Sequence, residues 1–320
     1  MRPPIWSCEA VNVSRAGHRP AGGVRRELAS MGRHPRKRLG QHFLADKSVA
    51  QRIVDLAQLR GTERVVEIGP GLGALTDVLV QRAGELWLIE VDADLAGRLR
   101  TRYADQPQVH IVEQDALKVD YTTLLGAGEA ALVVANLPYN VATAILRALL
   151  DARCFVRLIL MLQREVVDRL RAQPGTKDYG ALSVYTQLAA RLRPGLRVGP
   201  EAFVPRPKVE SEVVVVEPYA RPPLTVDDPA LLNRVVRAAF NQRRKQLANS
   251  LRAVCPHPAV ALAAAHIDPR RRPETLTLAE FAALSDVVRK QRQTTGGQTT
   301  DSRGQTTDNR RQTDPETTDA

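Results

Sequence analysis

The chain has 320 residues and a formal net charge of +11, from 46 Lys and Arg against 35 Asp and Glu. Its 25% charged and 43% hydrophobic residues are typical of globular proteins of about two domains, and exclude a wholly disordered or fibrous chain. No apolar run reaches the length of a membrane span or of a secretory signal. Three dispersed cysteines, Cys8, Cys154 and Cys255, argue against a disulfide framework or a local zinc site. We therefore expect a cytoplasmic protein with no metal and no membrane partner.

The positive charge is concentrated toward the N-terminus. Residues 1–38 have a net charge of +7, residues 291–320 have −1, and the remaining core has +5. A positive balance favours a polyanionic partner such as nucleic acid, although an arginine-rich proteome would produce the same excess. The charge alone leaves these alternatives open.

Both ends of the chain are predicted to be disordered. Residues 1–35 mix Arg, Pro and Gly without periodicity, and one interpretation is that translation starts at Met31. Residues 291–320 consist mainly of Gln, Thr, Asp, Arg and Gly. Such a segment has too little apolar surface to offset the entropy lost on ordering.

Between these ends, strands alternate with helices. Strand-length apolar runs separated by helical patterns are typical of a parallel sheet covered on both faces. Such a sheet binds ligands at the carboxyl ends of its strands. We predict strands at 64–68, 85–90, 109–113, 131–135 and 156–162, and helices at 74–82, 94–103 and 141–151.

A glycine-rich loop follows the first of these strands. Gly69, Gly71 and Gly73 are spaced for a tight turn that opens a helix and lets a ligand approach the backbone. The spacing differs from that of dinucleotide enzymes, and a purely structural turn is the alternative.

Two acidic residues follow later strands. Glu90 ends the second strand, where a carboxylate can accept hydrogen bonds from both ribose hydroxyls. Asp115 follows the third strand, where it could receive an exocyclic amino group. Either acid alone could be a solvated loop residue or a helix cap. Together with the glycine loop, they favour an adenosine-bearing ligand without a pyrophosphate.

The motif that points to chemistry is Asn136-Leu137-Pro138-Tyr139, directly after the fourth strand. The N6 amine of adenine is a poor nucleophile because its lone pair is delocalised into the ring. The Asn136 side-chain oxygen and a backbone carbonyl of Leu137 or Pro138 could accept both amine hydrogens and stabilise the developing charge. Tyr139 offers a face on which an extruded base can stack. A turn that merely caps the next helix is the alternative.

Cations cluster in the C-terminal part, which reads as short helices interrupted by prolines. Arg243, Arg244 and Lys245 follow an apolar-periodic segment at 231–240. They could contact RNA phosphates or form a solvated face. Two further cationic runs, 36–38 and 270–272, could extend such a surface.

Five motifs in this order resemble the KsgA/RsmA family of small-subunit (16S) ribosomal RNA adenine N6,N6-dimethyltransferases. The resemblance covers roughly residues 36–290 and is carried by RLGQHFL (38–44), EIGPGLG (67–73), NLPYN (136–140), FVPRPKV (203–209) and FNQRRK (240–245). It implies S-adenosylmethionine as methyl donor and 16S rRNA, in the small subunit or its precursor, as substrate. Two adjacent adenosines in the 3′-terminal hairpin loop would each be dimethylated.

The resemblance also implies roles for individual residues. Phe203 would stack on the target base opposite Tyr139, although a core phenylalanine is the competing interpretation. Many members have Asn where this chain has His42. By matching motifs, the donor pocket would comprise His42, Leu44, Gly69, Gly71, Glu90, Asp115 and Asn136.

We accordingly expect a class I, Rossmann-like α/β methyltransferase fold with a seven-stranded, mostly parallel sheet and a small α-helical C-terminal domain. The predicted boundaries are 1–35 for the N-terminal extension, 36–220 for the methyltransferase domain, 221–290 for the helical RNA-binding domain and 291–320 for the tail. We expect a monomer. The alternatives are an Erm-type 23S rRNA methyltransferase and a non-catalytic RNA-binding assembly or transcription factor on the same fold. An NAD oxidoreductase fits least.

Overall fold

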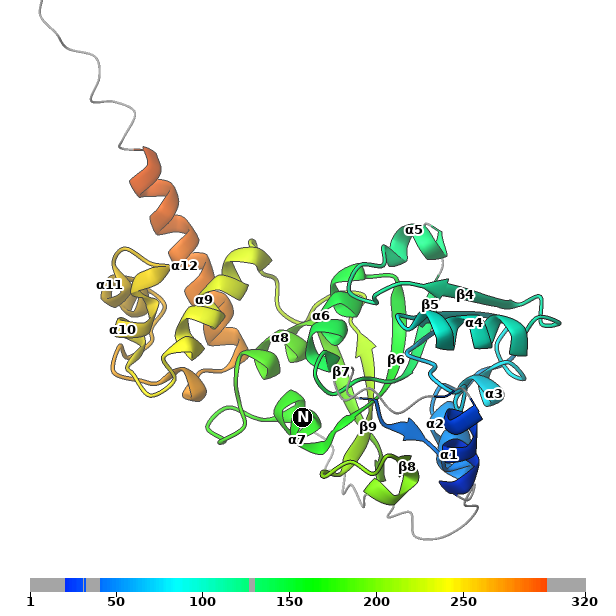
Figure 1. Ribbon diagram of the computed structural model, residues 1–320. Coiled ribbons are helices and arrows are strands. Elements are labelled where there is room, and N and C mark those ends of the chain that lie inside the picture. The colour runs from blue at the N-terminus through cyan, green and yellow to red at the C-terminus, as the bar shows by residue number, and fades with distance from the viewer. Residues whose placement is uncertain (1–20, 31, 33–40, 127–129, 298–320) are drawn as a thin grey trace, which may run out of the picture. The chain divides into compact units, whose positions relative to one another are not determined.

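The computed structural model describes residues 21–30, 32, 41–126 and 130–297. The chain divides into an N-terminal unit, residues 1–225, and a C-terminal unit, residues 226–320 (Figure 1). The cationic run 36–38 and most of the expected disordered ends lie outside the described residues. No helix among the described residues is long and apolar enough to span a membrane.

A seven-stranded sheet forms the centre of the N-terminal unit, with strand order β4-β3-β2-β5-β6-β9-β7. The first five strands in this order run parallel, and β9 pairs antiparallel with both β6 and β7. This arrangement confirms the predicted mostly parallel sheet. The strands are β2 (Arg64–Ile68), β3 (Glu85–Glu90), β4 (Val109–Glu113), β5 (Ala131–Asn136), β6 (Phe155–Gln163), β7 (Ala190–Val198) and β9 (Ser211–Pro218).

Alternating strand residues pack against helices on opposite faces of the sheet. Val65 belongs to one core cluster and the adjacent Val66 to the other, as the period of two in a strand requires. The first cluster includes residues of α2 (Lys47–Asp55), α3 (Thr76–Leu79) and α4 (Ala93–Arg102). The second includes residues of α5 (Tyr121–Leu125), α6 (Ala142–Ala152) and α7 (Arg164–Arg171), with α8 (Ala181–Ala189) packed against it (Figure 1).

A two-stranded sheet joins segments that are distant in sequence. Strand β1 (Phe43–Leu44) pairs antiparallel with β8 (Phe203–Val204), which follows the 3-10 helix η2 (Pro200–Ala202). Leu44 is the register partner of Phe203. The pairing therefore brings the first and fourth resemblance motifs together.

Order extends further than predicted at both ends. Residues 21–30, expected to be disordered, form helix α1 (Ala21–Ser30), in which Val24 and Leu28 are buried. At the other end, helix α12 (Leu278–Gly297) continues past the predicted boundary at 290. The periodicity of α1 is hard to recognise in sequence because only two of its ten residues are large and apolar.

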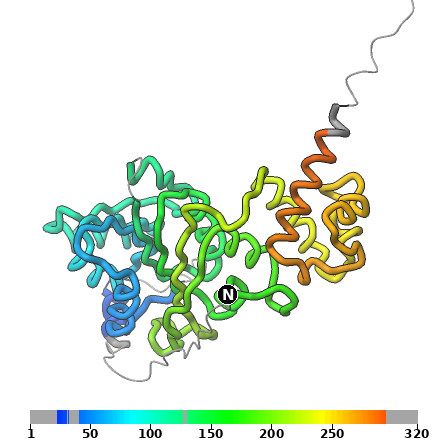
Figure 2. The backbone as a smooth tube through the Cα atoms, turned by 180° about the vertical axis from the view of Figure 1, so that it is seen from behind, coloured from blue at the N-terminus to red at the C-terminus, as the bar shows by residue number. Residues whose placement is uncertain are grey.

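The C-terminal unit is helical. Its core contains α9 (Pro229–Asn241) and α12, with Phe240 and Phe281 ring centroids 5.8 Å apart, and Figure 2 traces these two helices with the shorter ones beside them. The remaining elements are α10 (Leu247–Ser250), η3 (Leu251–Ala253), α11 (Pro258–Ala264) and η4 (Pro273–Thr275). A role for this unit in RNA binding stays a prediction.

Candidate active site

A pocket of about 1170 Å³, its open mouth included, lies at the carboxyl ends of β2, β3 and β5. This is where an open parallel sheet binds its ligands. Nine of the predicted site residues line it: His42, Leu44, Gly69, Gly71, Glu90, Asn136, Leu137, Pro138 and Tyr139.

The glycine loop lines the pocket, and its backbone has a conformation that glycine favours. Gly69 and Gly71 have φ angles of 66° and 58°, where a side chain would be strained. A Cβ atom on Gly71 would also lie 3.1 Å from the ring of Phe43. The Gly69 N–H donates to the Ile89 carbonyl at 2.9 Å, which ties the loop to β3.

The buried carboxylate of Glu90 connects the ends of β2 and β3. Its Oε2 accepts a hydrogen bond from the Gly71 N–H at 3.2 Å, and its Oε1 accepts one from the Asp92 N–H at 3.0 Å. Burial raises the pKa of Glu90, and the charge of Asp92 adds to that rise while the backbone N–H groups oppose it. Each oxygen keeps a second lone pair that could accept a hydroxyl from a ligand in the pocket.

A second carboxyl group, Glu67, lines the pocket and was not predicted as a site residue. It is 1% exposed, and its Oε2 accepts a hydrogen bond from Thr76 Oγ1 at 2.7 Å. Burial raises the pKa of Glu67 to about 8, which the Thr76 hydrogen bond only partly opposes. At neutral pH the side chain is therefore largely the neutral acid.

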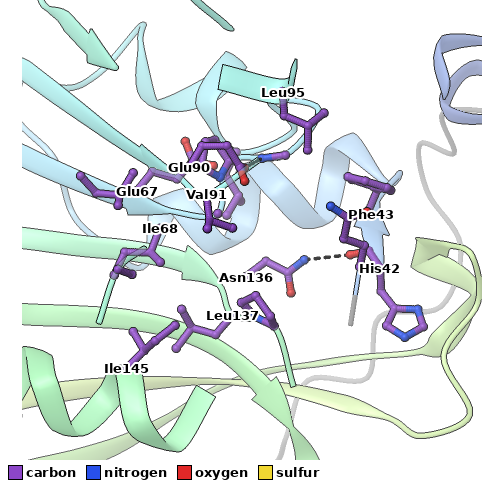
Figure 3. A pocket seen from close by; sticks show the side chains of 18 of the residues that line it. His42, Phe43, Glu67, Ile68, Glu90, Val91, Leu95, Asn136, Leu137 and Ile145 are labelled. Atoms are coloured by element: carbon purple, nitrogen blue, oxygen red, sulfur yellow. Dashed lines mark hydrogen bonds between the residues drawn. The ribbon is translucent and has the colours of Figure 1, made fainter. Parts of the chain in front are cut away.

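The Asn136 side chain is held in one orientation. Its Nδ2 donates to the backbone carbonyl of His42 at 3.1 Å, as the dashed line in Figure 3 shows. With the nitrogen engaged, the oxygen Oδ1 is available as an acceptor. The Pro138 carbonyl accepts from the Val141 N–H at 3.2 Å, so the Leu137 carbonyl is favoured as a second acceptor.

Tyr139 is anchored by its hydroxyl and covered by an imidazole ring. Its Oη lies 2.7 Å from Oγ of the fully buried Ser211 on β9. The His42 ring stacks on Tyr139 with centroids 5.4 Å apart, and His42 Nδ1 donates to the Pro205 carbonyl at 2.8 Å. Because a carbonyl can only accept, Nδ1 carries the proton in this contact. No sequence pattern indicated the part played by Ser211.

Two of the residues predicted to contact the donor or the target base do not line the pocket. Asp115 Oδ1 accepts from the Leu117 N–H at 3.0 Å, and only its neighbours Gln114 and Ala116 line the pocket. Phe203 is 3% exposed and packs in the core cluster that includes Leu44. This position fits the competing interpretation of a core phenylalanine, and stacking of Phe203 on a base opposite Tyr139 stays a prediction.

The predicted RNA-binding residues follow α9 in the C-terminal unit. Arg244 and Lys245 are exposed, and Arg243 is partly buried. In the other described cationic run, Arg270 pairs with Asp268 at 3.1 Å and Arg271 pairs with Glu280. Arg270 and Arg271 are therefore already paired within the protein.

Apolar residues that sequence reasoning missed complete the pocket. Val91 lines it with 56% of its surface exposed, unusual for a valine beside a buried strand end. Ala116 and Leu95 lie on the same pocket surface. The exposed Val91 side chain, next to Glu90, offers an apolar contact for an aromatic ring.

The sequence model of a protein family described as ribosomal RNA adenine dimethylase matches residues 32–290 of this chain. Curated relatives named ribosomal RNA small subunit methyltransferase A are similar over most of their length. The protein of Magnetococcus marinus is 47% identical over 83% of this chain and 96% of its own. That of Idiomarina loihiensis is 41% identical over 92% of this chain and 100% of its own.

Solved structures support the fold. A dimethyladenosine transferase from Plasmodium falciparum has a TM-score of 0.66 at 23% identity, covering 76% of this chain and 96% of its own. The 23S rRNA methyltransferase ErmE has a TM-score of 0.57 at 26% identity, covering 77% of this chain and 99% of its own.

The Glu67 carboxyl makes stability depend on pH. Its pKa rises from 4.5 to about 8 on folding, so the folded state binds the extra proton and loses stability as pH increases across that interval. We expect Glu67→Gln, which retains an oxygen for Thr76, to reduce the decline in melting temperature between pH 5 and 8. Glu201→Gln, at an exposed position, is the control and should follow the wild-type profile. An unchanged profile in Glu67→Gln would contradict the assignment.

Proposed function

The chain belongs to the ribosomal RNA adenine dimethylase family, and on this basis we propose that it dimethylates N6 of two adjacent adenosines in the 3′-terminal hairpin loop of 16S rRNA. The observation that carries the proposal is the fixed Asn136 amide beside the pocket at the strand ends. The names of the relatives, which specify the small subunit, support the choice of 16S over 23S rRNA.

The pocket suits S-adenosylmethionine, the methyl donor of this family. Val91 offers an apolar contact for adenine, the Glu90 oxygens offer acceptors for ribose hydroxyls, and the glycine loop leaves room for close approach to the backbone. When bound, the donor supplies an electrophilic methyl group on a sulfonium. The neutral Glu67 carboxyl can also donate a hydrogen bond from the pocket wall. Asp115, which lies between the pocket-lining residues Gln114 and Ala116, would accept a hydrogen bond from the exocyclic amino group of the donor's adenine.

The protein's part in the reaction is to make an amine nucleophilic. Asn136 Oδ1 and the Leu137 carbonyl would accept the two N6 hydrogens and draw the lone pair out of the ring. Pro138 fixes the backbone between these acceptors and Tyr139, whose face would stack on the extruded base. As the new N–C bond forms, the bond between the methyl carbon and the sulfonium sulfur would break, and S-adenosylhomocysteine would leave as a neutral thioether. The positive charge then on nitrogen would lie against two oxygen dipoles, and its proton would afterwards be lost to water. No strong base is needed.

The C-terminal unit would contribute to RNA binding through Arg244 and Lys245, with Arg243 beside them. RNA recognition of this kind relies on loop shape and unstacked bases, because the A-form major groove is too narrow for side chains. We further propose that the protein acts in the cytoplasm as a monomer. The Erm-type alternative shares the fold, so the substrate must be tested directly.

The target is identified by incubating the purified protein with labelled S-adenosylmethionine and immature small subunits, then mapping the modified nucleotides. We expect label on two adjacent adenosines near the 3′ end of 16S rRNA. Label on 23S rRNA alone, with large-subunit RNA offered in parallel, would support the Erm-type alternative. No label on either RNA would support a non-catalytic assembly factor.

Asn136→Ala should reduce methyl transfer by at least about 100-fold, the effect of removing one transition-state hydrogen bond. Binding of S-adenosylhomocysteine, measured by calorimetry, should fall much less. Asn136→Asp is the matched variant, because it keeps an acceptor oxygen while losing the donor to the His42 carbonyl; it should retain more activity than Asn136→Ala. Near-normal turnover in Asn136→Ala would refute the role of the amide oxygen.

Replacing Arg243, Arg244 and Lys245 by Ala should weaken RNA binding and flatten its dependence on salt. Three lost phosphate contacts would reduce the slope of log K against log salt by about 2 to 3. The slope is measured by titrating hairpin RNA at several ionic strengths. The control removes three exposed cations of the N-terminal unit, Arg60, Lys118 and Arg169. An equal loss of slope in both variants would assign the run after α9 to a solvated face.

A further inference from the structure

Helix α1 precedes residues 32–290, the region that matches the family, yet it packs against the back of the pocket wall. Val24 and Leu28 are 1% and 5% exposed. They belong to one buried cluster that also contains Phe43, Ala45, Leu72, Leu95 and Val204. Three of these partners, Phe43, Leu72 and Leu95, line the pocket.

An ionic contact links the same helix to the glycine loop. Glu27, whose side chain is 15% exposed, pairs with Arg98 and lies 3.8 Å from Arg102, both on α4. Arg102 in turn donates to the Leu72 carbonyl at 2.9 Å and to Asp77 at 2.6 Å. The Glu27 charge therefore supports the arginine that holds the loop carbonyl.

Phe43 transmits the packing of α1 to the glycine loop of the pocket. Phe43 belongs to the cluster with Val24 and Leu28, and its ring lies 3.1 Å from the position that a Cβ atom on Gly71 would occupy. Because Gly71 also donates to Glu90, a displaced Phe43 would disturb both the loop and the carboxylate.

We propose that α1 is a positioning element for the methyl-donor pocket, which holds Phe43, Leu72 and Leu95 in the arrangement that binds S-adenosylmethionine. Among the described residues, none of the helix lines the pocket. The helix therefore changes the affinity for the methyl donor by holding the wall residues in place, and it leaves the rate of the methyl-transfer step unchanged. A ten-residue helix is marginal in isolation; its order depends on Val24, Leu28 and Glu27. The inference rests on the proposed function in one respect only: it takes S-adenosylmethionine to be the ligand of this pocket.

The test compares three variants with the full chain: Val24→Ala with Leu28→Ala, Glu27→Gln, and a chain that begins at Met31. Arg25→Ala, at an exposed position of the same helix, is the matched control. The dissociation constant of S-adenosylhomocysteine is measured by calorimetry, and kcat and KM for the donor are measured with RNA held constant. Circular dichroism and melting temperature report on folding, so that Glu27→Gln remains informative if the shortened chain folds poorly.

We expect the double variant to raise the dissociation constant of S-adenosylhomocysteine about five- to tenfold. This is the effect expected when only about 10–20% of the molecules have the pocket in its binding-competent conformation. KM for the donor should rise in parallel while kcat at saturating donor stays unchanged. Glu27→Gln should change the same quantities in the same direction, and Arg25→Ala should change none.

A lower melting temperature with an unchanged dissociation constant would overturn the proposal, because it would make α1 a purely structural support. A fall in kcat with unchanged donor affinity would also overturn it. If the full chain itself fails to bind S-adenosylhomocysteine, the proposed function fails instead, so the two failures are distinguishable.

Discussion

The site depends on the Glu90 carboxylate, which ties together the loops that follow β2 and β3. A parallel sheet aligns the ends of β2 and β3, but it leaves the loops beyond them without partners. Glu90 satisfies the N–H groups of Gly71 and Asp92 at once, so the glycine loop and the start of α4 take their positions from one side chain. Its burial has an electrostatic cost, seen in the raised pKa, and the two backbone donors offset part of it.

The reacting side of the pocket is organised by contacts across long sequence separations. Pairing of β1 with β8 places the His42 carbonyl where it orients Asn136, and the His42 ring against Tyr139. Strand β9 supplies Ser211, which holds the Tyr139 hydroxyl. The Asn136 amide and the Tyr139 ring are thus positioned by elements that are not adjacent to the motif in the chain. Rigid positioning of this kind is what electrostatic stabilisation of a transition state requires.

The sequence predicted those parts of the fold and site that leave a local pattern in the chain. The buried strands read as continuous apolar runs, and β4 was predicted to its last residue at Glu113. Strand β7 was missed because Pro194 and Gly195 interrupt it, which an edge strand tolerates at an irregularity in its pairing. Ser211 and Phe43 were missed because a hydroxyl or a ring gives no local sign of a partner far away in the chain. Phe203 is buried where β8 pairs with β1, and the contact with a base that its motif suggested stays a prediction.

The fixed orientation of the Asn136 amide also bears on which base can enter. With Nδ2 engaged by the His42 carbonyl, the side chain keeps only its oxygen for a base, and in the proposed mechanism the Leu137 carbonyl would be the second acceptor. Adenine offers two amine hydrogens to this pair, whereas guanine would bring its O6 against the same two oxygens. A buried acceptor left without a donor costs about 1–3 kcal/mol, so guanine would be excluded by electrostatic mismatch without any steric gate. One hydrogen bond made within the protein would thereby decide the identity of the nucleotide.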